Sequence, residues 1–353
     1  MSRRAVSQNS RNRRSGLLGA VPLWVTVLLL LVVLLAATVV GVAVGAVPLS
    51  VGEVLGAIRR GISATSTGTT DFIVWDLRVP RVLEAILVGA GLALAGLIVQ
   101  VLVRNPIADS YVLGLSSGAG LGAVIVMTIA GSAVGIGVQT GAFGGAIAAG
   151  IAVAVLASSR GGFAAMRLVL VGIAVGHLAS GAMSFVVIRA SNADVAQQVM
   201  YWMLGSIAGA QWEHVPLVGL VVGVGLGLVA LAAPWMDALA LGDDAAAGLG
   251  LRVSRLRMAF FVVACALTAT VVSISGTIGF VGFVVPNLAR LLVGGMHRRV
   301  IPVTALLGSL LVLAADTSAR TLLAPSEIPI GILTALLGVP LFILVVRRSL
   351  RAA

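Results

Sequence analysis

A stretch near the C-terminal end, residues 327–342, reads EIPIGILTALLGVPLF. It places a carboxylate, Glu327, and a proline, Pro329, directly before an uncharged apolar run that contains two glycines and a second proline, Pro340. Helix-breaking residues are tolerated inside lipid only where neighbouring groups satisfy the backbone that they free. The stretch therefore predicts a membrane helix that begins at a water edge and packs among other helices.

The composition of the whole chain agrees with this prediction. Its 353 residues are 59% hydrophobic and 10% charged, whereas soluble domains are about half apolar and a quarter charged. A helix needs about 20 apolar residues to cross the hydrocarbon core. Ten stretches qualify: 22–47, 82–103, 113–131, 137–157, 168–188, 214–234, 258–275, 279–295, 300–315 and 328–346. We expect an all-α, polytopic membrane protein with about ten transmembrane helices.

These helices are expected to form a single transmembrane domain, residues 22–348. A basic N-terminal tail, residues 1–21, precedes it, and a short tail, residues 349–353, follows. The first apolar stretch is about twice as long as the core of a signal peptide, so we expect it to stay as a span.

Arginine placement orients the chain. If the N-terminus is cytoplasmic, 17 of the 23 arginines fall on inner loops and tails, which obeys the positive-inside rule and puts both termini in the cytoplasm. The net charge of +11 does not indicate nucleic-acid binding, because the arginines are spread over many loops. Membrane lipid is the expected partner of these cations.

Several kinds of site are excluded by residues that the chain lacks. It contains no lysine, so it has no P-loop for ATP, and its single cysteine, Cys265, excludes a multi-thiolate metal site. We predict no cofactor and no catalytic residue. The interiors of the predicted spans hold almost no ionisable residue besides Glu84, just inside the second span, and His177. An ion-coupled transport mechanism is therefore not indicated, and energy must come from another subunit.

Local patterns give further expectations. Glu84 is expected to pair with Arg81 three residues earlier, and His177 is expected to be packed or to line a pathway. Glycine pairs one helical turn apart predict close helix contacts. They are Gly41/Gly45, Gly131/Gly135, Gly172/Gly176, Gly219/Gly223 and Gly223/Gly227.

One pattern suggests an enzyme. Residues 114–118, GLSSG, match the Gly-x-Ser-x-Gly nucleophile elbow, so Ser116 or Ser117 with His177 and Asp109 would form an intramembrane serine hydrolase. The elbow requires a strand before the serine, and this segment opens an apolar helix instead. The hydrolase is therefore the remote alternative.

Six motifs, in order, resemble the permease subunits of iron-siderophore, haem and cobalamin ABC importers (FecCD-type permeases). They are RVPR (78–81), NPIADSYVLGLSSGA (105–119), YWMLGS (201–206), GTIGFVGFVVPNLAR (276–290), ADTSAR (315–320) and the opening stretch. Ser110 and Asn287 depart from the family pattern, which has Pro and commonly His there. Residues of these motifs expected in the pathway or its frame are Asn105, Pro106, Asp109, Ser116, Ser117, Gly118, Pro286, Pro329 and Gly331.

The resemblance implies an ABC type II importer permease in the cytoplasmic (inner) membrane of a bacterium. It implies two ATP-binding subunits, an extracytoplasmic substrate-binding protein and a second permease subunit, the same or a paralogue, with a copy of this chain preferred. The motif runs are closer to ferric-siderophore members, so ferric siderophore is expected, with haem or cobalamin as the alternative. We also expect the interface between the two permease subunits to be lined by Gly, Ala, Ser and Thr, which suits a bulky chelate that is passed along without tight binding.

The ATPase is expected to contact residues 237–251, which carry leucines that a solvated loop would not. We expect two short helices there, the second capped by Asp243 or Asp244 and ended by Gly248 or Gly250. The alternative is a segment lying on the lipid surface. The predicted contact residues are Leu241, Asp243, Asp244, Ala246, Gly248 and Leu249.

Three arginines, Arg78, Arg81 and Arg320, fall at the predicted outer ends of two spans. The resemblance implies that Arg78 and Arg320 receive glutamates of the binding protein. The alternative is that these arginines bind lipid or pair internally, for example Arg320 with Asp316 or Arg78 with Asp76.

Overall fold

The computed structural model describes residues 21–45, 47, 49–65, 68–129, 136–158, 163–190, 193–324 and 326–352, and this part of the chain is helical without any strand. The helices are α2 (Leu23–Ala43), α3 (Val51–Ile62), α4 (Thr69–Asp71), the π-helix η1 (Phe72–Arg78), α5 (Val79–Val103), the 3-10 helix η2 (Ser110–Leu113), α6 (Leu115–Ile129), α7 (Ile136–Ala157), α8 (Ala165–Ala190), α9 (Ala193–Leu204), α10 (His214–Leu231), α11 (Ala233–Ala240), α12 (Asp243–Gly248), α13 (Val253–Ser275), α14 (Val281–Val293), α15 (His297–Ala319) and α16 (Ile330–Ala352).

All ten predicted stretches coincide with helices: α2, α5, α6, α7, α8, α10, α13, α14, α15 and α16. Within the described residues, seven helices are long and apolar enough to span a membrane. The apolar parts of α6, α14 and α16 are shorter. The all-α membrane fold is thus confirmed, and the short helices α3 and α9 add to the expected set.

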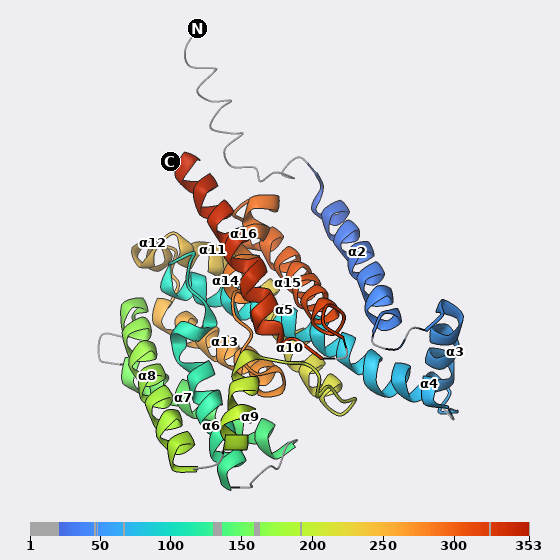
Figure 1. Ribbon diagram of the computed structural model, residues 1–353. Helices are drawn as coiled ribbons and strands as arrows, with labels where there is room; N and C mark the ends of the chain where they lie inside the picture. The colour runs from blue at the N-terminus through green and yellow to red at the C-terminus, as the bar shows by residue number, and fades with distance from the viewer. Residues whose placement is uncertain are drawn as a thin grey trace.

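Helix α5 lies at the centre of the bundle. The span that contains it is 83% buried in its most apolar window, against 17% for α2, and α5 contacts α10, α13, α14 and α15. In Figure 1 the beginning of α2, the end of α16 and the α11–α12 pair lie toward one end of the molecule, and α9 lies toward the other. The centrality of α5 makes it the element that connects these two ends.

Glycines set the closest helix crossings. A β-carbon on Gly96 would lie 1.9 Å from the carbonyl oxygen of Gly282, and one on Gly89 would lie 2.2 Å from that of Gly308. Only glycine allows α5 to approach α14 and α15 this closely. The predicted pairs behave differently: Gly172 touches the Val112 carbonyl, whereas Gly223 has no neighbour within 4 Å. The prediction of close packing was wrong for Gly223 and also for Gly227. Gly131 and Gly135 lie outside the described residues.

Local contacts hold the described residues between α2 and α5. A capping box starts α3, with the Ser50 hydroxyl accepting from the Glu53 amide and the Glu53 carboxylate accepting from the Ser50 amide. Arg60 and Asp71 form a two-bond ion pair that joins α3 to α4. The Trp212 indole donates to the Trp75 carbonyl oxygen at 2.7 Å, which ties this segment to the loop before α10.

Candidate functional site

Three helix ends meet inside the bundle: the end of α9, the end of α13 and the start of α16. The Ser206 amide donates to the Ser275 carbonyl oxygen at 2.8 Å, and the Ile330 amide donates to the Gly205 carbonyl oxygen at 3.0 Å. Gly205 and Gly276 have φ of 75° and 65°, which favours glycine. Non-helical backbone at membrane depth is tolerated where it is buried in protein or lines a cavity.

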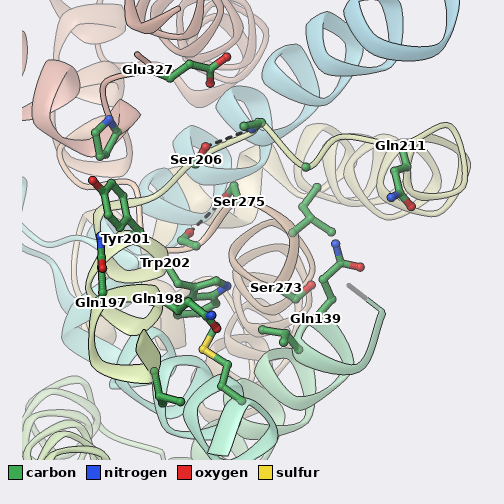
Figure 2. A pocket seen from close by; sticks show the side chains of 18 of the residues that line it. Gln139, Gln197, Gln198, Tyr201, Trp202, Ser206, Gln211, Ser273, Ser275 and Glu327 are labelled. Carbon is green, nitrogen blue, oxygen red and sulfur yellow. Dashed lines mark hydrogen bonds between the residues drawn. The ribbon is translucent and has the colours of Figure 1, made fainter. Parts of the chain in front are cut away.

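A cavity of about 820 Å³ lies beside this junction (Figure 2). The polar groups of its lining include the amides of four glutamines, the carboxylates of two acidic residues, and the hydroxyl and indole N–H groups of two aromatic side chains. The residues that line it are Met127, Val138, Gln139, Asp194, Val195, Gln197, Gln198, Tyr201, Trp202, Ser206, Ala208, Gly209, Gln211, Ser273, Ile274, Ser275, Gly276, Glu327, Ile328 and Pro329. Serine, glycine and alanine also contribute to this lining.

Of the predicted pathway residues, only Pro329 is in this lining. Gly331 packs instead, because a β-carbon there would lie 2.2 Å from the Leu204 carbonyl oxygen. Gly118 packs α6 against α7, with Gly145 as its neighbour, and Pro286 is buried inside α14. Gly118 and Pro286 therefore contribute to helix packing and do not line the cavity.

The Asn105–Asp109 loop lies against α14. The Asn105 side chain accepts from the Ile107 amide at 3.0 Å, which closes a turn, and Asp109 accepts from the Ser110 amide at 2.6 Å. The side-chain amide of Asn287 donates to the Pro106 carbonyl oxygen at 2.7 Å. Asn287 therefore makes a structural bond in the place where the family pattern commonly has histidine.

The serine motif does not assemble a hydrolase. A 3-10 helix, η2, precedes α6, and the Ser117 hydroxyl bonds to that of Ser180 at 3.2 Å. Ser116 is buried, and His177 lies exposed on α8 and is not among the residues that line this cavity, so the expectation that His177 is packed was wrong within the described part of the chain. A nucleophile needs a base within hydrogen-bond distance, and the hydrogen bonds of the described residues include none from a histidine to either serine.

An ion cluster, defined by Arg81, Asp316, Arg320 and Glu327, joins the cavity to the end of α15. Arg81 donates two bonds of 2.9 Å to the Glu327 carboxylate and one of 2.9 Å to Asp316, and Arg320 lies 3.5 Å from Asp316. The Asp316 side chain has no exposed surface. Arg320 thus forms the i,i+4 pair with Asp316 that was the alternative to a docking role.

Arg78 and Arg320 both reach the C-terminal end of α2. The Arg78 guanidinium donates to the carbonyl oxygens of Val42, Ala43 and Val47 at 3.0, 2.8 and 2.6 Å, and Arg320 donates to that of Gly41. Both arginines are 6% exposed. They satisfy carbonyl groups that a helix end leaves without partners, and the anticipated pair of Arg78 with Asp76 does not form.

Glu84 does not pair with Arg81, because the two carboxylates of the ion cluster take that guanidinium. Glu84 is 1% exposed and accepts from the Gln211 amide at 3.1 Å, and the same oxygen lies 3.0 Å from Nδ1 of His214. The predicted local pair was wrong. Glu84 instead fixes the start of α10 and the loop that carries Gln211 into the cavity.

Residues 237–251 form two short helices, as predicted. Ion pairs with residues of the neighbouring spans hold them in place. Asp243 takes two bonds from Arg257, which is 3% exposed, and lies 3.6 Å from Arg104 at the end of α5. Hydrogen bonds from Arg257 lower the pKa of Asp243. Asp237 likewise binds His297 at the start of α15 at 2.6 Å. The segment therefore rests on three spans.

Residues 237–251 also have an exposed face, which does not pack on the spans. Leu241 and Leu249 are 75% and 67% exposed, and Asp244 and Gly248 are also exposed. Ala246 is fully buried, so it packs α12 and cannot serve as a contact residue. Gly242, rather than an aspartate, precedes the first turn of α12, because Asp243 turns to Arg257.

Charge patterning does not reveal the glutamines of the cavity, because their side-chain amides are neutral. An uncharged amide pair, Gln197 and Gln198, in an apolar setting just before the Tyr201-Trp202 motif is a signal that could have found them. Gln139 and Gln211 are isolated in the sequence. They could not have been grouped without the fold.

Comparisons with known proteins agree with this architecture. Residues 29–348 match the FecCD transport family. The chain is 38% identical over 286 residues to an iron(3+)-hydroxamate import system permease protein of Bacillus subtilis, covering 81% of this chain and 74% of that protein. It is 41% identical over 285 residues to a cobalamin import system permease protein of Halobacterium salinarum, covering 80% and 76%.

One more relative and one solved structure are also similar to this chain. The chain is 38% identical over 296 residues to a hemin transport system permease protein of Yersinia pestis, covering 82% of this chain and 88% of that one. A solved structure described as an inward-facing conformation of a metal-chelate type ABC transporter has a TM-score of 0.80 and 28% identity, covering 92% of this chain and 99% of that chain.

Proposed function

The chain belongs to the FecCD transport family, and from that premise we propose that it carries a ferric siderophore through the cytoplasmic membrane. As a member of this family it is a multi-pass permease of an ABC importer for iron chelates, haem or cobalamin, and the ATPase resides in separate subunits. The observation that carries the proposal is the polar cavity at the junction of three helix ends, because a permease needs a path that its apolar helices alone do not provide.

Siderophore is preferred over haem and cobalamin because of two motif runs, residues 105–119 and 315–320, which are closer to the siderophore members. The relatives themselves divide, since their names include hydroxamate, hemin and cobalamin systems. The test is uptake of labelled ferric siderophore, haem and cobalamin by a strain that lacks this chain, with and without complementation. Restored uptake of cobalamin or haem alone would overturn the preference for siderophore.

The proposed topology places both termini in the cytoplasm with the α11–α12 pair. The start of α2, the end of α16 and the α11–α12 pair lie toward one end of the bundle, which supports this, as does the positive-inside bias (Figure 1). Two ATP-binding subunits would then contact α12 from the cytoplasm. The exposed leucines Leu241 and Leu249 support a protein contact there, because no fold contact covers them.

The substrate-binding protein is proposed to dock at the opposite end, around Arg78, Arg81 and Arg320. Their guanidinium groups are bonded inside this chain, so docking through them would exchange internal partners for glutamates of the binding protein. Arg81 and the 40% exposed Glu327 are the members best placed for such exchange. A second copy of this chain is the proposed permease partner, and co-purification of tagged and untagged copies tests it.

A further inference from the structure

Helix α3 lies at the edge of the molecule, beyond the end of α2 (Figure 1). One face of α3 is packed. Val54, Ala57 and Gly61 are buried there, and a β-carbon on Gly61 would lie 2.1 Å from the ring of Trp75 in η1. A larger residue at position 61 would therefore collide with that ring. The packing of this face against η1 determines which side of α3 is turned outward.

The outward side of α3 carries an apolar stripe, defined by Val51, Leu55 and Ile62. These three residues recur at intervals of four and seven positions, so they share a helix face, and their exposed fractions are 63%, 62% and 73%. Arg59 borders the stripe, because it lies four residues after Leu55, and it is exposed. Among the described residues Arg59 takes part in no ion pair, whereas Arg60 is paired. An apolar stripe beside an exposed cation is typical of a helix that lies in a membrane interface.

The length of α2 indicates the depth at which α3 lies. Helix α2 has 21 residues, which extend over roughly 30 Å at 1.5 Å per residue. The hydrocarbon core has about the same thickness, so Ala43 at the end of α2 lies at its boundary. Helix α3 contacts α2 and begins at Val51, a few residues beyond that boundary. The apolar stripe is therefore at the level of the lipid headgroups.

Two tryptophans mark the same level. The Trp212 indole donates to the Trp75 carbonyl oxygen at 2.7 Å, and the centroids of the two rings are 4.8 Å apart. Tryptophan is enriched at the membrane–water interface, because its ring is apolar and its N–H group is polar. Since Trp75 also packs on α3, this helix shares the depth that the tryptophans indicate.

We propose that α3 is a lipid-binding helix, which places its apolar stripe at the acyl boundary of the membrane and binds the phosphate of an anionic phospholipid through Arg59. A membrane suits both parts of the face, because headgroup phosphates attract the guanidinium while the acyl chains accept the stripe. In the topology proposed above, this is the outer leaflet. The proposal concerns lipid alone and does not depend on which cargo the importer carries.

The first test measures the depth of the stripe in the full-length chain. Nitroxide labels are attached at Leu55→Cys and Ile62→Cys, with Gly52→Cys and Ser63→Cys as exposed controls outside the stripe. All four variants carry Cys265→Ala, so that each chain has one cysteine. In vesicles of phosphatidylcholine and phosphatidylglycerol, we expect a higher ratio of oxygen to water-soluble nickel accessibility at the stripe than at the controls. An equal ratio at all four positions, or protection of the stripe from both reagents by a covering protein, overturns the proposal.

The second test measures the headgroup preference. A bimane fluorophore at Leu55→Cys is placed in vesicles with equal parts of the two lipids, and either one lipid or the other is brominated so that it quenches the label. Quenching by brominated phosphatidylglycerol is expected to exceed that by brominated phosphatidylcholine by up to roughly fivefold, the effect of one arginine near an anionic surface. Arg59→Lys should keep this preference and Arg59→Gln should abolish it. An equal preference in Arg59→Gln and in the chain with Arg59 would overturn the phosphate contact.

Discussion

Arg78 and Arg320 illustrate how single residues close the end of the bundle where α2 ends. Both were singled out from the sequence because cations are rare on that side. Their partners are carbonyl groups of α2, 36 and 279 residues away along the chain. The sequence predicts that both arginines lie near helix ends, which the structure shows. Their partners could not be predicted, because every residue has a main-chain carbonyl group and the sequence does not indicate which one an arginine will bind.

Replacing Arg78 tests its bonds to α2. Arg78→Met leaves three carbonyl oxygens without their donor, and we expect a loss of about 2 kcal/mol in stability because buried unsatisfied groups are costly. Thermal unfolding in detergent measures it, with Arg59→Met on the exposed face of α3 as the control. A normal unfolding temperature combined with weaker, salt-dependent docking of the binding protein would instead make Arg78 a docking residue.

Asp243 is the residue that ties α12 to α5 and α13. Asp243→Asn leaves the buried Arg257 without its carboxylate, and we expect a loss of about 1 to 3 kcal/mol, less than for a fully buried pair because Asp243 is 40% exposed. Asp244→Asn, at an exposed neighbour, is the matched control. Equal unfolding temperatures of the two variants would show that the pair does not hold α12.

The same pair predicts a pH dependence. Because the folded-state pKa of Asp243 is lowered by Arg257, its contribution is present above the unfolded value of about 4 and is lost as pH falls through the lower folded value. Stability should therefore be insensitive to this group between about pH 5 and 8. Unfolding temperatures of wild type and Asp243→Asn should converge as the buffer is made more acidic, and a gap that widens toward low pH would contradict the assignment.

At the scale of elements, the long helices were predictable because each needs about 20 apolar residues to cross the membrane. Helix α9 was not, since it has 12 residues and carries Asp194, Gln197 and Gln198 among its apolar ones. The junction of α9, α13 and α16 was also beyond prediction. It depends on which helix ends meet, and these lie at residues 204, 275 and 330.

Close helix crossings give an element-scale prediction. Gly96→Ala forces α5 away from the Gly282 carbonyl of α14, so we expect a marked loss of stability. Gly223→Ala, in α10 with open space around it, should be neutral or stabilising by up to about 1 kcal/mol, because alanine favours helix. Thermal unfolding of the two variants compares them directly. Similar effects of both would mean that the α5–α14 crossing tolerates a methyl group.

The exposed face of α12 gives the second element-scale prediction. Leu249→Glu changes a 67% exposed side chain, so we expect normal folding but loss of ATPase coupling to import. Ala246→Glu, at a fully buried position, should fail to fold and serves as the contrast. The measurement is ATP hydrolysis and uptake by the reconstituted importer. Normal uptake by Leu249→Glu would remove α12 from the contact with the ATPase.

At the scale of the whole molecule, α5 spans the distance between the ion cluster and α12. Arg81 near its start joins the ion cluster beside the cavity, and Arg104 just after its end joins Asp243 beneath α12. At 1.5 Å per residue these two arginines are roughly 35 Å apart along the helix. Helix α5 thus carries a direct structural link between the proposed ATPase contact at α12 and the cavity where cargo would pass.

The most direct test of this account measures ATP-dependent iron uptake. The permease is reconstituted with its ATP-binding subunits and binding protein, and radiolabelled ferric trihydroxamate is offered on the side of the binding protein. The account predicts uptake that requires this chain, the binding protein and hydrolysable ATP on the opposite side, and that stops with a non-hydrolysable analogue. Uptake that proceeds at the same rate without ATP hydrolysis would contradict it.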